Sequence, residues 1–296
     1  MKIAITGSHG LIGSTLADAL KARGDTVVPL VRTEPEPGEI AWNPQEGTID
    51  AAALNGIDAV VHLAGEGIGD HRWTSAHKAR VLDSRVRGTT LIAETIAGLQ
   101  DKPKVLVSGS AIGFYGDCGD EILTEDSARG DDFLAHVVDQ WETSTAAAES
   151  AGIRVVTIRS SPVLTKKGGI LPRMMIPFRL FVGGRLASGR QYLSWISLAD
   201  EIAAILFVLD SEVSGPVNLT APEPVTNAEF TKVLASALHR PAILPVPAFA
   251  LKLVLGSGMA EGMVLVSQRV VPDRLLEAGF SFRHPRLADA LAAELA

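Results

Sequence analysis

Three glycines near the start of the chain are the residues whose spacing most directly indicates chemistry. They lie in "MKIAITGSHGLIGSTLADAL", between a short apolar run and a stretch with helical periodicity. One glycine at such a turn can adopt backbone angles that other residues avoid, a second lets the main chain approach a pyrophosphate, and a third lets the helix pack closely on the strand. The amides at the helix N-terminus then point at the phosphates. The pattern predicts a dinucleotide site rather than a mere tight turn, made of Gly7, Ser8, His9, Gly10, Leu11, Ile12 and Gly13.

An arginine at the end of the next apolar run bears on which dinucleotide binds. The run "TVVPLV" is followed directly by Arg32. NAD-specific folds place an acidic residue there for the ribose hydroxyls, whereas an arginine suits the 2′-phosphate of NADP through charge-assisted hydrogen bonds. We therefore predict NADP, with NAD less favoured. The alternative is a solvated arginine at a strand end.

These residues need a scaffold that brings the ends of several strands together. Apolar runs without alternation recur through the first half of the chain, and segments of helical periodicity separate them. This order predicts an α/β fold with a doubly wound parallel, Rossmann-like sheet and a smaller C-terminal lobe. Pro29 suggests an edge or irregular position for its strand. The Pro- and Gly-rich residues 34–50 are expected to form a loop.

The composition of the sequence changes near residue 166, where prolines and glycines interrupt the alternation of apolar runs and helical segments. We predict an NAD(P)-binding Rossmann-like domain over 1–165 and a smaller substrate lobe over 166–296. Excursions from the last strands would build this lobe, so the two parts are free to interleave.

Composition excludes several classes of function. The chain of 296 residues has a net charge of -7, so we expect no nucleic-acid partner. Its apolar stretches are shorter than the roughly 18 residues that span a bilayer, so we expect no membrane partner. The lone cysteine, Cys118, fits a reducing compartment, and we expect a cytoplasmic protein. His62, His71 and His77 match no metal-ligand spacing, so we predict no metal.

Four segments, in order along the chain, resemble the motifs of the extended short-chain dehydrogenase/reductase family. They are "TGSHGLIG", "DAVVHLAGE", "SRVRGT" and "SGSAIGFYGD". The resemblance implies that Leu63, Ala64 and Gly65 pass beside the adenine side of the cofactor. It also places Arg85 where the family has an asparagine, and Ser110 at the catalytic serine or threonine position. Ser108, on the same strand as Ser110, is counted with the cofactor-binding residues.

The match is closer to one branch, the epimerase-like proteins named after nucleoside-diphosphate-sugar epimerases. "GEGIGDHRW" and "LSWISLAD" resemble that branch, and the tail over 245–296 resembles its small C-terminal domain of unassigned function. The resemblance implies an NAD(P)-dependent oxidoreductase or epimerase-like enzyme acting on a carbonyl, alcohol or sugar-nucleotide substrate. It also implies that the long helices near 75–98 and 132–150 could pair in a homodimer, although both are needed to cover the sheet.

The catalytic Tyr-x-x-x-Lys pair of the parent family is missing. The helix that should carry it, "FLAHVVDQWETSTAAAESAG", has no tyrosine and no lysine. Alignment on Glu142 places Leu134 and Val138 at the two catalytic positions. Tyr115 is a candidate proton donor in place of the pair, and a packing role is its alternative. The absence favours a second hypothesis, a dinucleotide-binding regulator or redox sensor without hydride chemistry.

Overall fold

The chain divides into two compact units that are each discontinuous in sequence. The computed structural model describes residues 1–295. Unit 1 comprises residues 1–110, 137–158 and 202–217, and unit 2 comprises residues 111–136, 159–201 and those from 218 onward. The glycine corner therefore belongs to unit 1, and most of the C-terminal third belongs to unit 2.

An eight-stranded sheet runs through unit 1 in the order β12-β8-β6-β5-β1-β2-β3-β4. Strands β1, β2, β3, β5 and β6 pair in parallel, and β4 pairs antiparallel with β3. Residues 3–6 of β1 and all four residues of β5 are completely buried because helices cover both faces of the sheet. This confirms the predicted α/β fold. The strands are β1 (Lys2–Thr6), β2 (Thr26–Val31), β3 (Ile40–Asn43), β4 (Thr48–Ile49), β5 (Ala59–His62), β6 (Val105–Ala111), β8 (Arg154–Ser160) and β12 (Gly215–Leu219).

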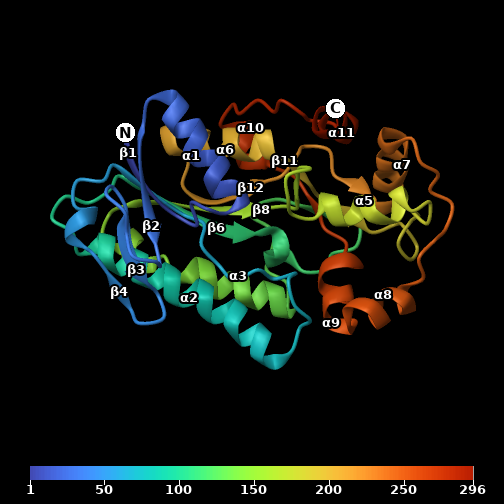
Figure 1. The fold of residues 1–296 in the computed structure, drawn as a ribbon, viewed down its shortest axis with the longest axis horizontal. Helices are drawn as coiled ribbons and strands as arrows, with labels where there is room; N and C mark the ends of the chain where they lie inside the picture. Colours follow the sequence, from blue (N-terminus) through green and yellow to red (C-terminus); the bar gives the residue numbers. More distant parts are fainter. Residues whose placement is uncertain (296) are drawn as a thin grey trace. The chain divides into compact units, whose positions relative to one another are not determined.

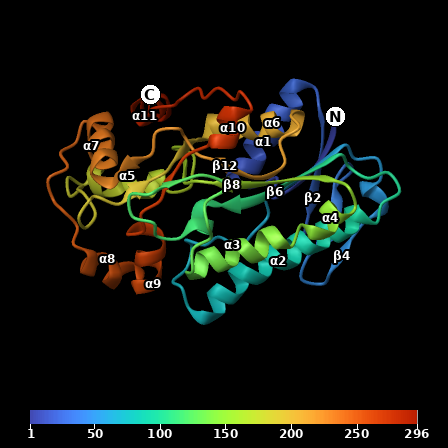
Figure 2. The ribbon, with the colours of Figure 1, turned by 180° about the vertical axis from the view of Figure 1, so that it is seen from behind.

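Helices lie on both faces of this sheet. Helices α1 (Leu11–Arg23) and α6 (Leu198–Asp210) lie on one face, and α2 (Ser75–Ala97) and α3 (Phe133–Thr143) lie on the other, as Figures 1 and 2 show from opposite sides. A short helix, α4 (Ala146–Ser150), packs on α2, and the 3₁₀ turn η1 (Ala52–Leu54) precedes β5. The longer helices bury an apolar stripe, such as Leu16 and Leu20 of α1 or Ile92 and Ile96 of α2.

The expectation of a loop over residues 34–50 is wrong. Strands β3 and β4 lie there and extend the sheet. Ile40 and Trp42 are buried while Ala41 between them is exposed, which is the alternation of a strand with one covered face. Pro29 has the irregular position that the sequence suggested: it pairs with β1, but β3 joins β2 only from Leu30 onward. Its missing N–H therefore interrupts no ladder.

Unit 2 consists of short elements around its own core. Trp195, Phe230 and Leu291 are among the side chains of that core. Within residues 1–295 no helix is both long and apolar enough to cross a membrane. The elements are η2 (Ile112–Tyr115), β7 (Ile122–Leu123), β9 (Val163–Leu164), α5 (Leu171–Arg179), β10 (Tyr192–Leu193), β11 (Ile196–Ser197), β13 (Val225–Thr226), α7 (Asn227–Leu238), α8 (Ala248–Leu255), α9 (Ser257–Met259), η3 (Ala260–Val264), β14 (Arg269–Val270), α10 (Asp273–Glu277) and α11 (Leu287–Leu295).

Candidate functional site

The ends of three adjacent parallel strands bring most of the predicted site residues of unit 1 to one edge of the sheet. Thr6 of β1 is in register with His62 of β5, and His62 is in register with Ser108 of β6. The glycine corner follows Thr6, the segment 63–65 follows His62, and Ser110 lies two residues beyond Ser108. Ligands of open α/β sheets bind at this carboxyl edge.

The glycine corner has the geometry of a phosphate-binding turn. Gly7 has φ +69°, in the left-handed region that favours glycine, and its carbonyl accepts a hydrogen bond of 2.9 Å from the Gly10 amide. A Cβ atom on Gly13 would overlap the Gly7 carbonyl oxygen, so a glycine is required for α1 to start this close to the turn. Gly10 caps α1 without a side chain, which leaves the first-turn amides facing the corner. Of the other predicted residues here, His9 is exposed, Ser8 is buried, and Leu11 and Ile12 are half-buried.

Arg32 lies directly after β2 with its side chain exposed. It makes no side-chain hydrogen bond or ion pair with any part of residues 1–295. A guanidinium with all its N–H groups available can donate two parallel hydrogen bonds to the oxygens of a phosphate. The position thus fits the predicted contact with a 2′-phosphate.

His62 is a structural residue of the sheet edge. Its Nδ1 lies 2.7 Å from the Thr6 hydroxyl oxygen, and its ring is completely buried. Burial lowers its pKa to about 4, so the ring is neutral at neutral pH. In the described part of the chain no group of three or more His, Cys, Asp or Glu side chains is arranged to hold a metal ion.

Arg85 of α2 holds the segment after β5 through hydrogen bonds to main-chain carbonyls. The Arg85 guanidinium donates from Nη1 to the carbonyl oxygens of Glu66 (3.0 Å) and Val81 (3.2 Å), and it lies 4.8 Å from the ring centroid of Trp141. Burial lowers its pKa to about 10, which leaves it charged at neutral pH. Its polar contacts hold the loop in place. A direct contact with the cofactor, as the family resemblance implies, stays a prediction.

Ser110 is paired with a carboxylate. Its hydroxyl donates a hydrogen bond of 2.6 Å to Oε1 of Glu142 on α3, and the serine is only 6% exposed. Helix and strand approach closely here, since a Cβ atom on Gly109 would lie 2.9 Å from the Trp141 ring. Ser108 is fully buried, and its hydroxyl faces the Gly109 carbonyl oxygen at 3.4 Å.

Glu142 is a candidate functional residue that sequence reasoning did not single out, since it served only to align the helix. The sequence signal that could have pointed to Glu142 is a carboxylate on the helix that should carry the catalytic Tyr-x-x-x-Lys pair but lacks it. At the two positions of that pair, Leu134 is half-buried and Val138 is buried. Neither side chain can transfer a proton.

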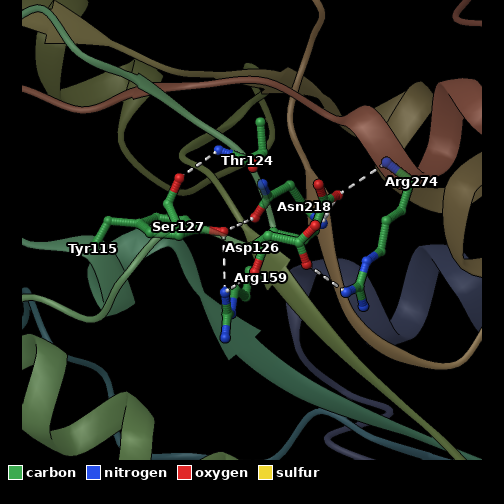
Figure 3. Close-up of polar contacts among 8 residues, drawn as sticks. Tyr115, Thr124, Asp126, Ser127, Arg159, Asn218 and Arg274 are labelled. Atoms are coloured by element: carbon green, nitrogen blue, oxygen red, sulfur yellow. Dashed lines mark hydrogen bonds and ion pairs between the residues drawn. The ribbon is translucent and has the colours of Figure 1, made fainter.

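Tyr115 lies in unit 2, inside a buried polar cluster (Figure 3). Its hydroxyl donates to Oδ1 of Asn218 at 2.7 Å and accepts from Nη1 of Arg159 at 3.1 Å. The side chain is 1% exposed, and burial raises its pKa to about 12. Glu125 and Arg274 extend the cluster, because Glu125 Oε1 accepts from the Asn218 amide at 2.9 Å and Arg274 pairs with Asp126 at 2.9 Å. This environment favours the packing role for Tyr115.

Comparisons with known proteins place relatives along nearly the whole chain. Residues 3–220 match the family model described as NAD dependent epimerase/dehydratase family, and residues 246–294 match a domain of unknown function, DUF1731. A Mycobacterium tuberculosis protein named Epimerase family protein MT2273 is 43% identical over 98% of this chain and 96% of its own length. The human Epimerase family protein SDR39U1 is 37% identical over 98% of both chains. A crystal structure of human SDR39U1 with NADPH superposes with a TM-score of 0.91 at 34% identity, covering 100% of this chain and 99% of that one.

Proposed function

The chain belongs to the NAD-dependent epimerase/dehydratase family, and from that premise we propose that it is an NADP-dependent oxidoreductase in which Ser110 and Glu142 transfer the proton. The observation that carries the proposal is the 2.6 Å hydrogen bond between these two side chains. Both belong to the unit that also holds the glycine corner. The substrate class is a carbonyl, an alcohol or a sugar nucleotide.

The residues of unit 1 fit the proposed cofactor. The first-turn amides of α1 and the glycine corner would hold the pyrophosphate, and Arg32 would hold the 2′-phosphate. Of the remaining predicted contacts, Leu63, Ala64 and Gly65 directly follow β5 and Ser108 is opposite His62 on β6. Arg85 on α2 donates to the Glu66 carbonyl next to Gly65. The human relative solved with NADPH supports this choice of cofactor. When bound, the cofactor exchanges a hydride with a carbon atom of the substrate.

Ser110 and Glu142 would move the proton that must accompany the hydride. In oxidation, the substrate hydroxyl gives its proton to Ser110 Oγ, while the serine proton passes along the existing hydrogen bond to the Glu142 carboxylate. The carbon loses a hydride, and the C–O single bond becomes a carbonyl. In reduction the same protons move in reverse from a protonated Glu142. Serine needs such a partner because its own hydroxyl is a weak acid and a weak base.

A second candidate function follows from the residues at the missing pair. The half-buried Leu134 and the buried Val138 stand where the family has tyrosine and lysine, which favours a dinucleotide-binding regulator or redox sensor. Such a protein would keep the glycine corner and bind NADPH without turning it over. The two candidates differ in whether any substrate oxidises the bound cofactor.

The test is NADPH oxidation with a panel of aldehydes, quinones and keto-sugars, followed by three variants. With a reactive substrate, we expect Ser110→Ala and Glu142→Gln each to lower kcat by about 100-fold or more while the Kd for NADPH stays nearly unchanged. Tyr115→Phe is the control, and folded protein of this variant should keep its turnover. Loss of catalysis in Tyr115→Phe alone would contradict the assignment. Tight NADPH binding with no turnover across the panel would favour the regulator.

A further inference from the structure

Unit 2 carries most of the large apolar side chains that are exposed in the described part of the chain. Nine of the twelve that are exposed within residues 1–295 fall in two segments, 176–182 and 243–254, and each is at least 48% exposed. Helix α8, "AFALKLVL", buries none of its residues. The nine are Ile176, Leu180, Phe181, Val182, Ile243, Leu244, Phe249, Leu253 and Val254, and they are called the apolar face below.

Backbone hydrogen bonds join the two segments into one surface. The Leu244 amide donates to the Gly183 carbonyl at 3.3 Å, and the Val246 amide donates to the Arg185 carbonyl at 2.9 Å. The Arg240 guanidinium lies 4.9 Å from the ring centroid of Phe181. The orange segment that follows α7 continues from this pairing into α8 (Figure 1). The apolar face therefore spans the end of α5, the paired segment and α8.

The charge around the apolar face opposes that of the whole chain. Residues 166–199 and 230–260 contain nine lysines and arginines and no aspartate or glutamate, although the chain as a whole has 34 acidic and 27 basic residues. Five of these arginines are exposed: Arg173, Arg179, Arg185, Arg190 and Arg240. The nearest acidic residue after α8, Glu261, pairs with Lys252 at 2.5 Å. The two ranges that contain the apolar face thus carry a net positive charge, with Glu229 and Glu261 flanking the second range.

We propose that the apolar face docks on the surface of an anionic lipid bilayer. Exposed Phe, Leu, Ile and Val side chains gain free energy by entering the boundary between headgroups and acyl chains, and the arginines around them attract anionic headgroups. A soluble acidic partner could pair with the arginines. Its negative charge would not explain why α8 exposes the apolar side chains of Phe249, Leu253 and Val254. Helix α8 has eight residues and is about 12 Å long, so it can lie in the interface but cannot span it. The proposal departs from the expectation of no membrane partner, which was based on the absence of stretches long enough to span a bilayer.

Vesicle flotation with the full chain tests this proposal. We expect the protein to float with phosphatidylcholine vesicles that contain phosphatidylglycerol and to stay in solution with pure phosphatidylcholine. Phe249→Ser/Leu253→Ser should weaken binding about tenfold or more, and Arg179→Gln/Arg185→Gln should weaken it and reduce its salt dependence. The matched control is Leu276→Ser, an exposed apolar residue in α10 outside the face, and it should float like the parent protein. NADPH affinity, unchanged in every variant, verifies folding.

Three outcomes would overturn the proposal. The first is no flotation with anionic vesicles at low salt. The second is equal flotation of the parent protein and the Phe249→Ser/Leu253→Ser variant. The third is that the parent protein does not float and is dimeric by light scattering, while the Phe249→Ser/Leu253→Ser variant is monomeric. That result would make the apolar face an interface between copies of this chain.

Discussion

The side chains of Thr6 and His62 are joined by a 2.7 Å hydrogen bond between neighbouring strands at the edge of the sheet that carries the glycine corner. The Thr6 hydroxyl oxygen also accepts from the amides of Leu63 (3.1 Å) and Ala64 (3.2 Å). The hydroxyl can donate its single proton to His62 Nδ1 in the tautomer that carries the ring proton on Nε2, a buried nitrogen with no partner in the described residues. One hydroxyl thus ties the end of β1 to the end of β5 and to the segment after it.

Removal of this hydroxyl should destabilise unit 1. Thr6→Val keeps the shape and the strand propensity but leaves His62 Nδ1 and the Ala64 amide without the hydroxyl, while the Leu63 amide keeps its bond to the Thr6 carbonyl. We expect a loss of about 1–3 kcal/mol in the free energy of unfolding, because buried polar groups without partners retain their desolvation cost. Thr48→Val, on the exposed strand β4, is the control and should change stability little. Equal losses in the two variants would contradict the role of the Thr6 hydroxyl.

His62 should make the protein sensitive to acid. Its pKa falls from 6.5 to about 4 on burial, so between these values the unfolded chain binds a proton that the folded protein does not. The contribution of His62 to the free energy of unfolding is fully present above pH 6.5 and should decrease as the pH falls toward about 4. Urea unfolding at several pH values would measure this slope. The slope should be smaller in His62→Gln, and an unchanged slope would show that other groups cause it.

The glycine corner allows binding and folding to be tested separately. A Cβ atom on Gly10 would have one near neighbour, the Gly7 carbonyl oxygen at 3.2 Å, so Gly10→Val should fold. Its side chain would project into the approach path of the pyrophosphate, and we expect NADPH binding to be lost in calorimetry. Gly98→Val, at the exposed end of α2, is the matched control. An unchanged NADPH affinity in Gly10→Val would show that the glycine corner is a tight turn and not a pyrophosphate site.

Much of the fold followed from the sequence, because strands buried on both faces read as plain apolar runs. β3 was missed because it has four residues flanked by prolines and glycines, and its alternation of Ile40, Ala41 and Trp42 is too short to outweigh them. The glycine corner was found because its residues are neighbours in sequence. The pairing of Ser110 with Glu142 was not, because 32 residues separate them and only the packing of α3 on β6 fixes the contact. Tyr115 remained ambiguous in the sequence for a similar reason, since its partner Asn218 lies 103 residues away.

A buried glutamate in unit 2 should have the opposite pH effect to His62. Glu201 is completely buried, and its Oε1 accepts a 2.6 Å hydrogen bond from Ser160. Burial raises its pKa from 4.5 to about 8, so the folded protein retains a proton that the unfolded chain loses above pH 4.5. The contribution of this group to the free energy of unfolding is fully present below pH 4.5 and is lost as the pH rises toward 8. The free energy of unfolding falls over this range by up to about 1.4 kcal/mol per pH unit.

Glu201→Gln should remove that dependence. The amide keeps the hydrogen bond from Ser160 and cannot ionise, so its free energy of unfolding should vary less between pH 5 and 8 than that of the parent protein. The exposed Glu212→Gln serves as the control and should keep the parent slope. A Glu201→Gln variant with the parent slope would mean that Glu201 is ionised in the folded protein.

Cofactor choice should depend on Arg32. Its guanidinium is exposed at the end of β2 and makes no side-chain hydrogen bond or ion pair with residues 1–295, so it can pair with the 2′-phosphate that distinguishes NADPH from NADH. We expect the parent protein to bind NADPH at least about tenfold more tightly than NADH, equivalent to about 1.4 kcal/mol. Arg32→Gln should remove most of that preference by weakening NADPH binding while NADH binding stays the same. Arg87→Gln, an exposed arginine on α2, makes the same change of charge elsewhere in unit 1 and should leave the preference intact. Equal affinities for the two cofactors in the parent protein would contradict the assignment and leave Arg32 as a solvated charge.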